Sequence, residues 1–214
     1  MPSRRRASAG TDRSWSVTIE RALRAAAGRE GIAPLCPRVQ RVKWTVHGRR
    51  ELYASPWVSL SLVDVEVPGQ RRYEHHVIDA PDAAGVLVAD PDRGVLLIWR
   101  HRFLGDEWAW EIPGGMVEQD ESPAVAAHRE CVEESGWAPD ELRLLHRFHP
   151  IAGQSTQTFW LFGATGATRV GERDGDETDR VEWHDDDAVR GIVERNEVLD
   201  GLSVIALLGH LAGR

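Results

Sequence analysis

The chain has 214 residues, an apolar content of 42% and a formal net charge of -8 at pH 7. This length fits one domain, or one domain with an appendage, and the apolar content is enough for a real hydrophobic core. The acidic charge argues against a general nucleic-acid binder, because such affinity comes largely from basic side chains that neutralise phosphates. Two cysteines do not make a disulfide framework, so we expect reduced thiols and a cytoplasmic protein. We expect no export signal and no membrane span, since no apolar run is long enough.

Residues 1–40 differ from the rest and are predicted to form a partly disordered extension with a short helix. Arg4 to Arg6 lie among Ser, Gly and Ala, a composition typical of disorder. Apolar residues between Val17 and Ala26 then have helical spacing. A basic arm that binds nucleic acid is an alternative interpretation of the arginine run. Residues 41–214 are predicted to form the main domain.

Alternating apolar residues from Val42 onward predict an antiparallel meander of strands. We expect a turn at His47-Gly48, and the third run of the meander covers Tyr73 to Ile78. Two further strands, Gly85–Val88 and Gly94–Trp99, flank an Asp-Pro-Asp turn. This part of the chain is therefore predicted to be rich in β-structure.

The segment from Trp99 to Pro113, WRHRFLGDEWAWEIP, leads into a glycine pair. Trp108 and Trp110 alternate with polar neighbours, so both are expected on one face of a strand. The two indoles have two interpretations: a part of the core, or an aromatic wall beside a ligand.

The stretch from Gly114 to Trp137, GGMVEQDESPAVAAHRECVEESGW, carries the strongest pattern in the chain. Ser122 followed by Pro123 predicts a helix start, with a side-chain oxygen at the N-cap and proline at the first helical position. Gly136 predicts a left-handed stop. Three small residues form a narrow stripe that is predicted to pack closely against a neighbour: Ala124, Ala127 and Cys131.

Three carboxylates share another side of this predicted helix: Glu130, Glu133 and Glu134. Arg129 lies four residues before Glu133 and is expected to pair with it. Carboxylates crowded together repel one another unless a cation joins them, and their hard oxygen atoms suit Mg2+ or Mn2+. A solvated acidic face is the alternative interpretation, but the glycine pair and the Arg-Glu spacing favour a metal site.

Beyond the helix, strands are predicted at Leu142–His149 and Thr156–Phe162. Val170 to Arg180 is an acidic loop broken by glycine, and its simplest interpretation is a solvated loop. Two helices, Asp185–Glu194 and Gly201–Leu211, are predicted to end the chain.

Counted from Gly115, the helix and its approach follow the pattern G-x5-E-x7-R-E-U-x-E-E-x-G-U, where U is a bulky apolar residue. This pattern resembles the catalytic box of the Nudix hydrolases, which cleave nucleoside diphosphates linked to some other group. The resemblance implies an α/β/α sandwich with a mixed sheet, preceded here by N-terminal antiparallel strands. The box helix would cover one side of the sheet and the C-terminal helices the other.

The resemblance also implies a metal site with Mg2+ as the cofactor and Mn2+ as an alternative. Glu130 and Glu134 match the ligand positions, and the Gly114 carbonyl is an extra ligand that the family implies. Glu133 joins these ligands or supports them, aligned by Arg129.

The flanking segments resemble the ADP-ribose pyrophosphatase branch of the family. Arg102 and Glu111 match positions that line the substrate side there, and Trp110 is a further candidate for substrate binding. The N-terminal strands of this branch often build a dimer, so we expect a homodimer. The acidic loop resembles a catalytic loop whose glutamate positions or deprotonates water. Glu177 is the match, with Glu172 as an alternative, and Glu121 of the box is a second candidate for orienting the water.

These residues predict a metal-dependent pyrophosphohydrolase that acts on ADP-ribose or a related nucleoside diphosphate sugar and releases a nucleoside monophosphate and a sugar phosphate. Two alternatives remain open. One is a Nudix hydrolase of another nucleotide, such as a damaged triphosphate or a dinucleotide cofactor. The other is a non-catalytic module that senses a nucleotide and regulates a partner.

Overall fold

The computed structural model describes residues 43–173 and 177–213, and the predictions made for residues 1–40, including their short helix, lie outside these ranges. The strands are β1 (Thr45–Ala54), β2 (Ser59–Glu66), β3 (Arg72–Asp79), β4 (Ala83–Asp90), β5 (Gly94–Arg102), β6 (Glu107–Glu111), β7 (Gly114–Met116), β8 (Trp137–Pro139), β9 (Arg143–Phe148), β10 (Phe159–Ala164), β11 (Ala167–Arg169) and β12 (Thr178–His184). The helices are α2 (Pro123–Ser135), α3 (Asp186–Glu194) and α4 (Gly201–Leu211).

The first three strands form an antiparallel sheet in the order β1-β2-β3, which confirms the predicted meander. The turn expected at His47-Gly48 is wrong, because β1 runs on through these residues to Ala54. The register against β2 shifts between Val46 and Gly48, so the extra residue is absorbed as a β-bulge. The His47 ring lies 2.7 Å from a carboxylate oxygen of Glu66 on β2, which secures the bulged segment.

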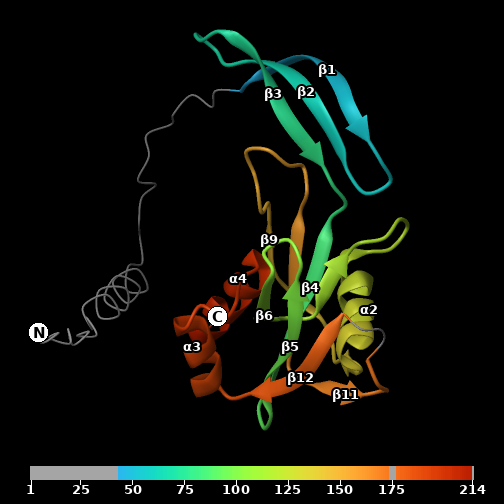
Figure 1. Cartoon of the computed structure of the whole chain (residues 1–214), viewed down its shortest axis with the longest axis vertical. Coiled ribbons are helices and arrows are strands. Elements are labelled where there is room, and N and C mark those ends of the chain that lie inside the picture. Colours follow the sequence, from blue (N-terminus) through green and yellow to red (C-terminus); the bar gives the residue numbers. More distant parts are fainter. Residues whose placement is uncertain (1–42, 174–176, 214) are drawn as a thin grey trace, which may run out of the picture. The chain divides into compact units, whose positions relative to one another are not determined.

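A larger, mixed sheet has the order β12-β5-β4-β10-β9, with β6 paired to β5 and β7 to β4, and β8 pairs with β11 in a separate two-stranded sheet (Figure 1). The β4–β10 pair is parallel, whereas the neighbouring pairs are antiparallel. The central strands β4 and β5 are rich in Val and Leu, as strands buried on both faces must be.

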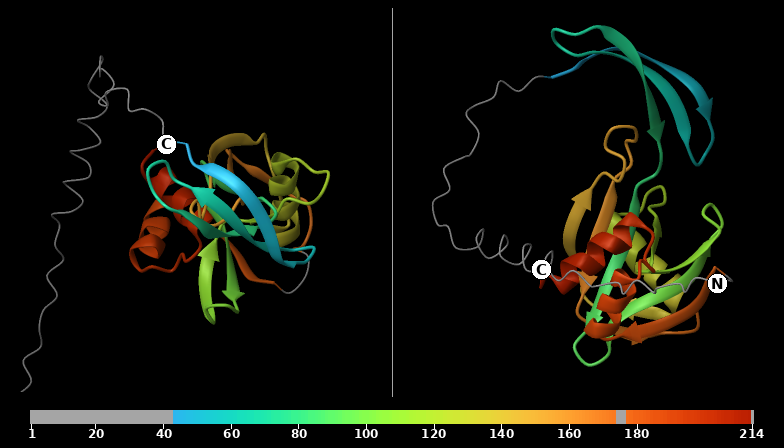
Figure 2. Two further views of the ribbon diagram at one scale, coloured as in Figure 1. Left: turned by 90° about the horizontal axis from the view of Figure 1, so that it is seen from above. Right: turned by 60° about the vertical axis from the view of Figure 1, so that its left-hand side comes forward.

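Helices cover both faces of this mixed sheet, which gives the predicted α/β/α sandwich (Figures 1 and 2). Along β4, the side chain of Leu87 belongs to one core and those of Val86 and Val88 to the other, since successive strand residues point to opposite faces. The core that contains Leu87 also holds apolar residues of α3 and α4. The other core holds residues of α2, so the box helix packs on the opposite face of the sheet from α3 and α4.

The box helix α2 begins and ends where the sequence predicts. Ser122 is the N-cap, and its hydroxyl accepts a hydrogen bond from the Val125 amide. Gly136 ends the helix in the left-handed conformation, with φ of 74°. The small stripe packs on the sheet, where Cys131 is buried as a free thiol, and burial raises the pKa of this thiol to about 12. No helix in the described ranges is long and apolar enough to cross a membrane.

Candidate active site

Arg129 holds together three of the box carboxylates. Its Nη1 atom donates hydrogen bonds to Glu130 and to Glu133, each at 2.9 Å, so the predicted Arg129–Glu133 pair is present. Its Nη2 atom donates to Glu121 at 2.7 Å, a contact that helix spacing alone did not indicate. The hydrogen bond from Arg129 lowers the pKa of Glu121, whereas burial raises the pKa of Glu130. Arg129 therefore fixes the direction of carboxylates that would otherwise repel one another.

Glu134 is almost fully buried, and its hydrogen-bond partners are not those of the Arg129 cluster. One of its oxygens accepts a hydrogen bond from the Gly114 amide at 2.8 Å, and the other accepts one from Arg100. Burial raises the pKa of Glu134 to about 7, although Arg100 and the Gly114 amide act in the opposite direction. The box helix is thus connected to β7 through Glu134.

The two glycines before the helix are required by close packing. A Cβ atom on Gly115 would lie 2.4 Å from the carboxyl carbon of Glu130, and one on Gly114 would lie 2.8 Å from the backbone of Ala84. Neither glycine has a positive φ angle. The two glycines are therefore needed because the backbone approaches Glu130 and β4 closely.

The chemistry of the donor set fits a hard cation, because carboxylate oxygens of Glu130 and Glu133 converge on one nitrogen of Arg129. In the described ranges, however, no group of three or more His, Cys, Asp or Glu side chains is arranged to hold a metal ion. Arginine side chains contact the carboxylates instead. The assignment of Gly114, Glu130, Glu133 and Glu134 as metal ligands therefore stays a prediction.

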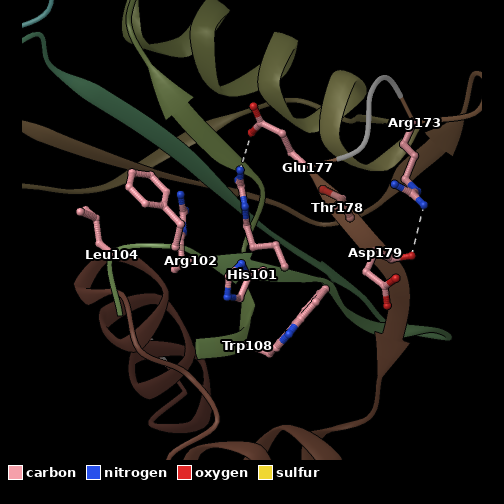
Figure 3. A pocket seen from close by; sticks show the side chains of 10 residues that line it. His101, Arg102, Leu104, Trp108, Arg173, Glu177, Thr178 and Asp179 are labelled. Carbon is pink, nitrogen blue, oxygen red and sulfur yellow. Dashed lines mark hydrogen bonds and ion pairs between the residues drawn. The ribbon is translucent and has the colours of Figure 1, made fainter. Parts of the chain in front are cut away.

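A cavity of about 620 Å3 opens beside the box, between β5, the β5–β6 turn, β6 and the start of β12 (Figure 3). Its lining combines positive charge with aromatic and apolar side chains, among which Phe103 and Leu104 are highly exposed. The lining residues are Arg100, His101, Arg102, Phe103, Leu104, Trp108, Arg173, Glu177, Thr178 and Asp179. Positive and aromatic groups of this kind suit a nucleotide, which has an anionic and an aromatic part.

Arg100 joins the box to this cavity. The residue is only 7% exposed, and its guanidinium donates to Glu134 through Nη1 and to Glu177 through Nη2, the latter at 2.5 Å. Arg100 reaches Glu177 because it pairs with Thr178 across β5 and β12. Arg100 therefore connects the box helix to the cavity. Sequence reasoning did not find Arg100, since its role depends on the pairing of two strands that are far apart in the chain.

The acidic loop brings one of its two candidate glutamates to the cavity. The Glu177 side chain is 79% exposed at the cavity and points towards α2 (Figure 3). Glu172 accepts a hydrogen bond from Arg169 at 2.8 Å and does not line the cavity. Glu177 is thus the better-placed candidate to act on a bound substrate.

Arg102 faces the cavity and is held by Glu111. Its guanidinium donates two hydrogen bonds to the carboxylate, at 2.8 Å through Nε and 2.5 Å through Nη2. The Glu111 side chain is only 3% exposed, and this hydrogen-bonded partner raises the pKa of Arg102. Arg102 is in position to touch a ligand, while Glu111 orients the Arg102 guanidinium from behind.

Trp110 does not line the cavity, which favours its interpretation as a part of the core over that of a substrate-binding residue. Trp110 is 7% exposed in the core, and its ring centroid lies 5.0 Å from that of Trp99 and 4.5 Å from that of His184. The Trp110 amide donates a hydrogen bond to the carbonyl of Glu197, so the segment after α3 covers this end of β6. Trp108, on the same face but beyond that cover, is 48% exposed and lines the cavity.

Comparisons with known proteins agree with this architecture. Residues 79–202 match the family model described as the NUDIX domain. The chain is 35% identical over 171 residues to the CMP-5'-(N-acetyl-N-hydroxy-3-aminopropyl)phosphonate hydrolase of Streptomyces rubellomurinus, covering 79% of this chain and 83% of that protein. It is 26% identical over 163 residues to the ADP-ribose pyrophosphatase of Bacillus subtilis, covering 74% of this chain and 88% of that protein.

The fold also resembles a solved structure described as an ADP compounds hydrolase, with a TM-score of 0.65 and 18% identity over 83% of this chain and 98% of that chain. At this identity the likeness shows the fold alone. The family match covers more than half of the chain and includes the box. The chain therefore belongs to the Nudix family and is a Nudix hydrolase with pyrophosphohydrolase activity, near the ADP-ribose branch.

Proposed function

We propose that this enzyme cleaves the phosphoanhydride bond of a nucleoside monophosphate joined to a sugar phosphate, with ADP-ribose as the first candidate substrate. The observation that carries the proposal is the position of Arg100, which contacts Glu134 of the box and Glu177 at the cavity. A nucleotide in this cavity would place its phosphates beside the box carboxylates. The volume of about 620 Å3 is sufficient for a nucleotide of this size.

The proposal includes a divalent cation, Mg2+ or Mn2+, held by Glu130, Glu134 and the Gly114 carbonyl, with Glu133 joining or supporting them. When bound, the cation neutralises the diphosphate and stabilises charge that develops on the phosphoryl oxygens. Arg129 keeps Glu130 and Glu133 directed to one point. The Gly115 backbone leaves room for the Glu130 carboxylate.

Arg102 would bind a phosphate oxygen, because Glu111 fixes its guanidinium plane at the cavity wall. Glu177 would orient the attacking water and accept its proton while the water oxygen bonds to one phosphorus and the bond to the bridging oxygen breaks. Glu121, the other candidate for this role, is paired with Arg129, so we assign it to holding Arg129 in place.

A second candidate substrate is a cytidine monophosphate joined to a phosphonate. It is favoured by the 35% identity to the Streptomyces rubellomurinus hydrolase, which exceeds the identity to the Bacillus subtilis ADP-ribose pyrophosphatase. Both candidates contain a nucleoside monophosphate linked through a P–O–P bond. The same residues would therefore perform the same bond cleavage, and the two candidates differ in the base and the leaving group.

We also infer that the chain forms a homodimer through the β1-β2-β3 sheet. Large apolar side chains are exposed on this sheet, in the turn between β1 and β2 and directly before β1, which is typical of an interaction surface. They include Trp44, Val46, Tyr53, Trp57 and Tyr73. Light scattering on the purified chain tests this inference, since a dimer has twice the mass of 23.9 kDa and a monomer would contradict it.

Product analysis with Mg2+ or Mn2+ tests the proposed function. The panel contains ADP-ribose, other nucleoside diphosphate sugars, a CMP-linked phosphonate, dinucleotides and nucleoside triphosphates. We expect ADP-ribose to give AMP and ribose 5-phosphate. We also expect it to be cleaved faster than the triphosphates and the dinucleotides. Faster cleavage of the phosphonate would favour the second candidate. Binding of a nucleotide without cleavage of any compound would contradict the proposal and favour a regulatory module.

A further inference from the structure

The cavity has two chemically different sides. On one side, the Glu177 side chain reaches towards the box helix and accepts a hydrogen bond from Arg100 (Figure 3). On the other, the Trp108 indole and the Asp179 carboxylate border the cavity away from that helix (Figure 3). If the phosphates lie at the box, as in the proposed function on which this inference rests, the base of the nucleotide lies beside Trp108.

Trp108 is a fixed, half-exposed aromatic surface. On β6 it pairs with His101 of β5, and the two ring centroids are 5.3 Å apart. Its ring is also nearly parallel to that of Trp99, at an interplanar angle of 15° and a centroid distance of 6.2 Å. An indole held by two neighbours loses little freedom when a base stacks on it, and stacking on aromatic side chains suits every base.

Asp179 is placed at the cavity by an irregularity in β12. The register against β5 shifts between Thr178 and Arg180, so Asp179 is an extra residue in the strand. Arg180 donates to Asp179 Oδ2 at 3.2 Å, while no donor from the described residues reaches Oδ1. An ionised carboxylate accepts hydrogen bonds and donates none, so a ligand group that contacts Asp179 Oδ1 has to supply an N–H or O–H group.

We infer that Trp108 is the stacking platform for the substrate's base and that Asp179 accepts a hydrogen bond from an exocyclic amino group of that base. The site then selects adenine over hypoxanthine and cytosine over uracil. In each disfavoured base a carbonyl oxygen replaces the amino group, and this oxygen faces the carboxylate without a proton between them.

Titration calorimetry with matched mononucleotides tests the inference on the full chain with Mg2+. AMP is compared with IMP, and CMP with UMP, because each pair differs at the amino position. We expect the amino member to bind at least about tenfold more tightly, since the carbonyl leaves the carboxylate unpaired. Trp108→Ala is expected to weaken AMP and IMP equally, by about fivefold or more, and Trp108→Phe by less.

Asp179→Asn is expected to reduce the AMP-to-IMP ratio to less than about threefold, because an amide can also donate to a carbonyl. Asp92→Asn is the matched control, since Asp92 is exposed in the β4–β5 turn and does not line the cavity. Leu208→Ala, on the exposed side of α4, is the control for removal of a large exposed apolar side chain. Both controls are expected to keep the affinities and the ratio of the unaltered protein.

Equal affinities for the two members of each pair, or no measurable binding of any of the four, would overturn the inference. Unchanged affinities in Trp108→Ala would overturn the stacking platform. If the proposed function is wrong and this inference is right, no phosphoanhydride is cleaved, but the protein still binds the amino bases more tightly. Rapid cleavage without any preference between bases would overturn this inference and leave the proposed function standing.

Discussion

A single methyl group at Gly115 is expected to disable the site without unfolding the protein. In Gly115→Ala the new Cβ would lie 2.4 Å from the carboxyl carbon and from Oε1 of Glu130. Carbon contacts favour about 3.5 Å, so the carboxylate must move by about 1 Å. A misplacement of about 1 Å in a catalytic site costs about a hundredfold in rate. The backbone of Gly115 has no positive φ angle, so alanine fits it and we expect the unfolding free energy to change by less than about 1 kcal/mol.

The assay for Gly115→Ala is kcat/KM on the best substrate together with urea unfolding. Gly209→Ala in α4 is the matched control, because nothing lies within 4 Å of a Cβ atom added there. This control is expected to keep full activity and to gain about 0.5–1 kcal/mol of stability, since alanine suits a helix better than glycine. Full activity in Gly115→Ala would refute the reasoning that Glu130 must keep its present position.

Three further changes test other parts of the account. Glu134→Gln should keep the fold and reduce kcat at least about a hundredfold by removing a proposed metal ligand, and near-normal turnover would place the metal elsewhere. Glu111→Gln should lower the free energy of unfolding by about 1.5–3 kcal/mol in urea and raise KM, because Arg102 loses a charged hydrogen-bond partner. An unchanged KM would argue against a role for Arg102 in binding. A hydrogen bond from Arg93 lowers the pKa of Asp90 to about 2, so this pair stabilises the fold above about pH 4 and the stabilisation is lost as the pH falls through about 2. The difference in unfolding midpoint between the unaltered protein and Asp90→Asn should therefore shrink as the pH falls from about 4 to about 2. A difference that stays constant over this pH range would contradict a stabilising Asp90–Arg93 pair.

The part of the fold that local patterns determine could be predicted from the sequence. Ser122 and Gly136 set the ends of the box helix by capping, which depends only on adjacent residues. The two apolar runs on either side of the Asp-Pro-Asp turn predicted the strands β4 and β5. The His47-Gly48 turn was wrong, since a glycine after an alternating run can mark a bulge as well as a turn.

The site itself depends on contacts between elements that are far apart in the sequence, and no local sequence pattern predicts these contacts. Arg100 reaches Glu177 only because β5 and β12 are neighbours in the sheet. Strand alternation placed Trp108 and Trp110 on one face, but which of them is covered depends on the segment near Glu197, which arrives from after α3. Helical spacing predicted the pair of Arg129 with Glu133. It could not predict the contact of Arg129 with Glu121, because Glu121 lies before the helix.

The most direct test of the central claim follows ADP-ribose by phosphorus NMR with Mg2+ and either the unaltered protein or Glu134→Gln. The claim is that the box carboxylates and the cavity work as one site for breaking a P–O–P bond. We predict that the unaltered protein replaces the diphosphate signals with those of two phosphate monoesters, AMP and ribose 5-phosphate, while Glu134→Gln leaves the diphosphate intact over the same time. Persistent diphosphate signals with the unaltered protein, or equal conversion by both proteins, would contradict the account.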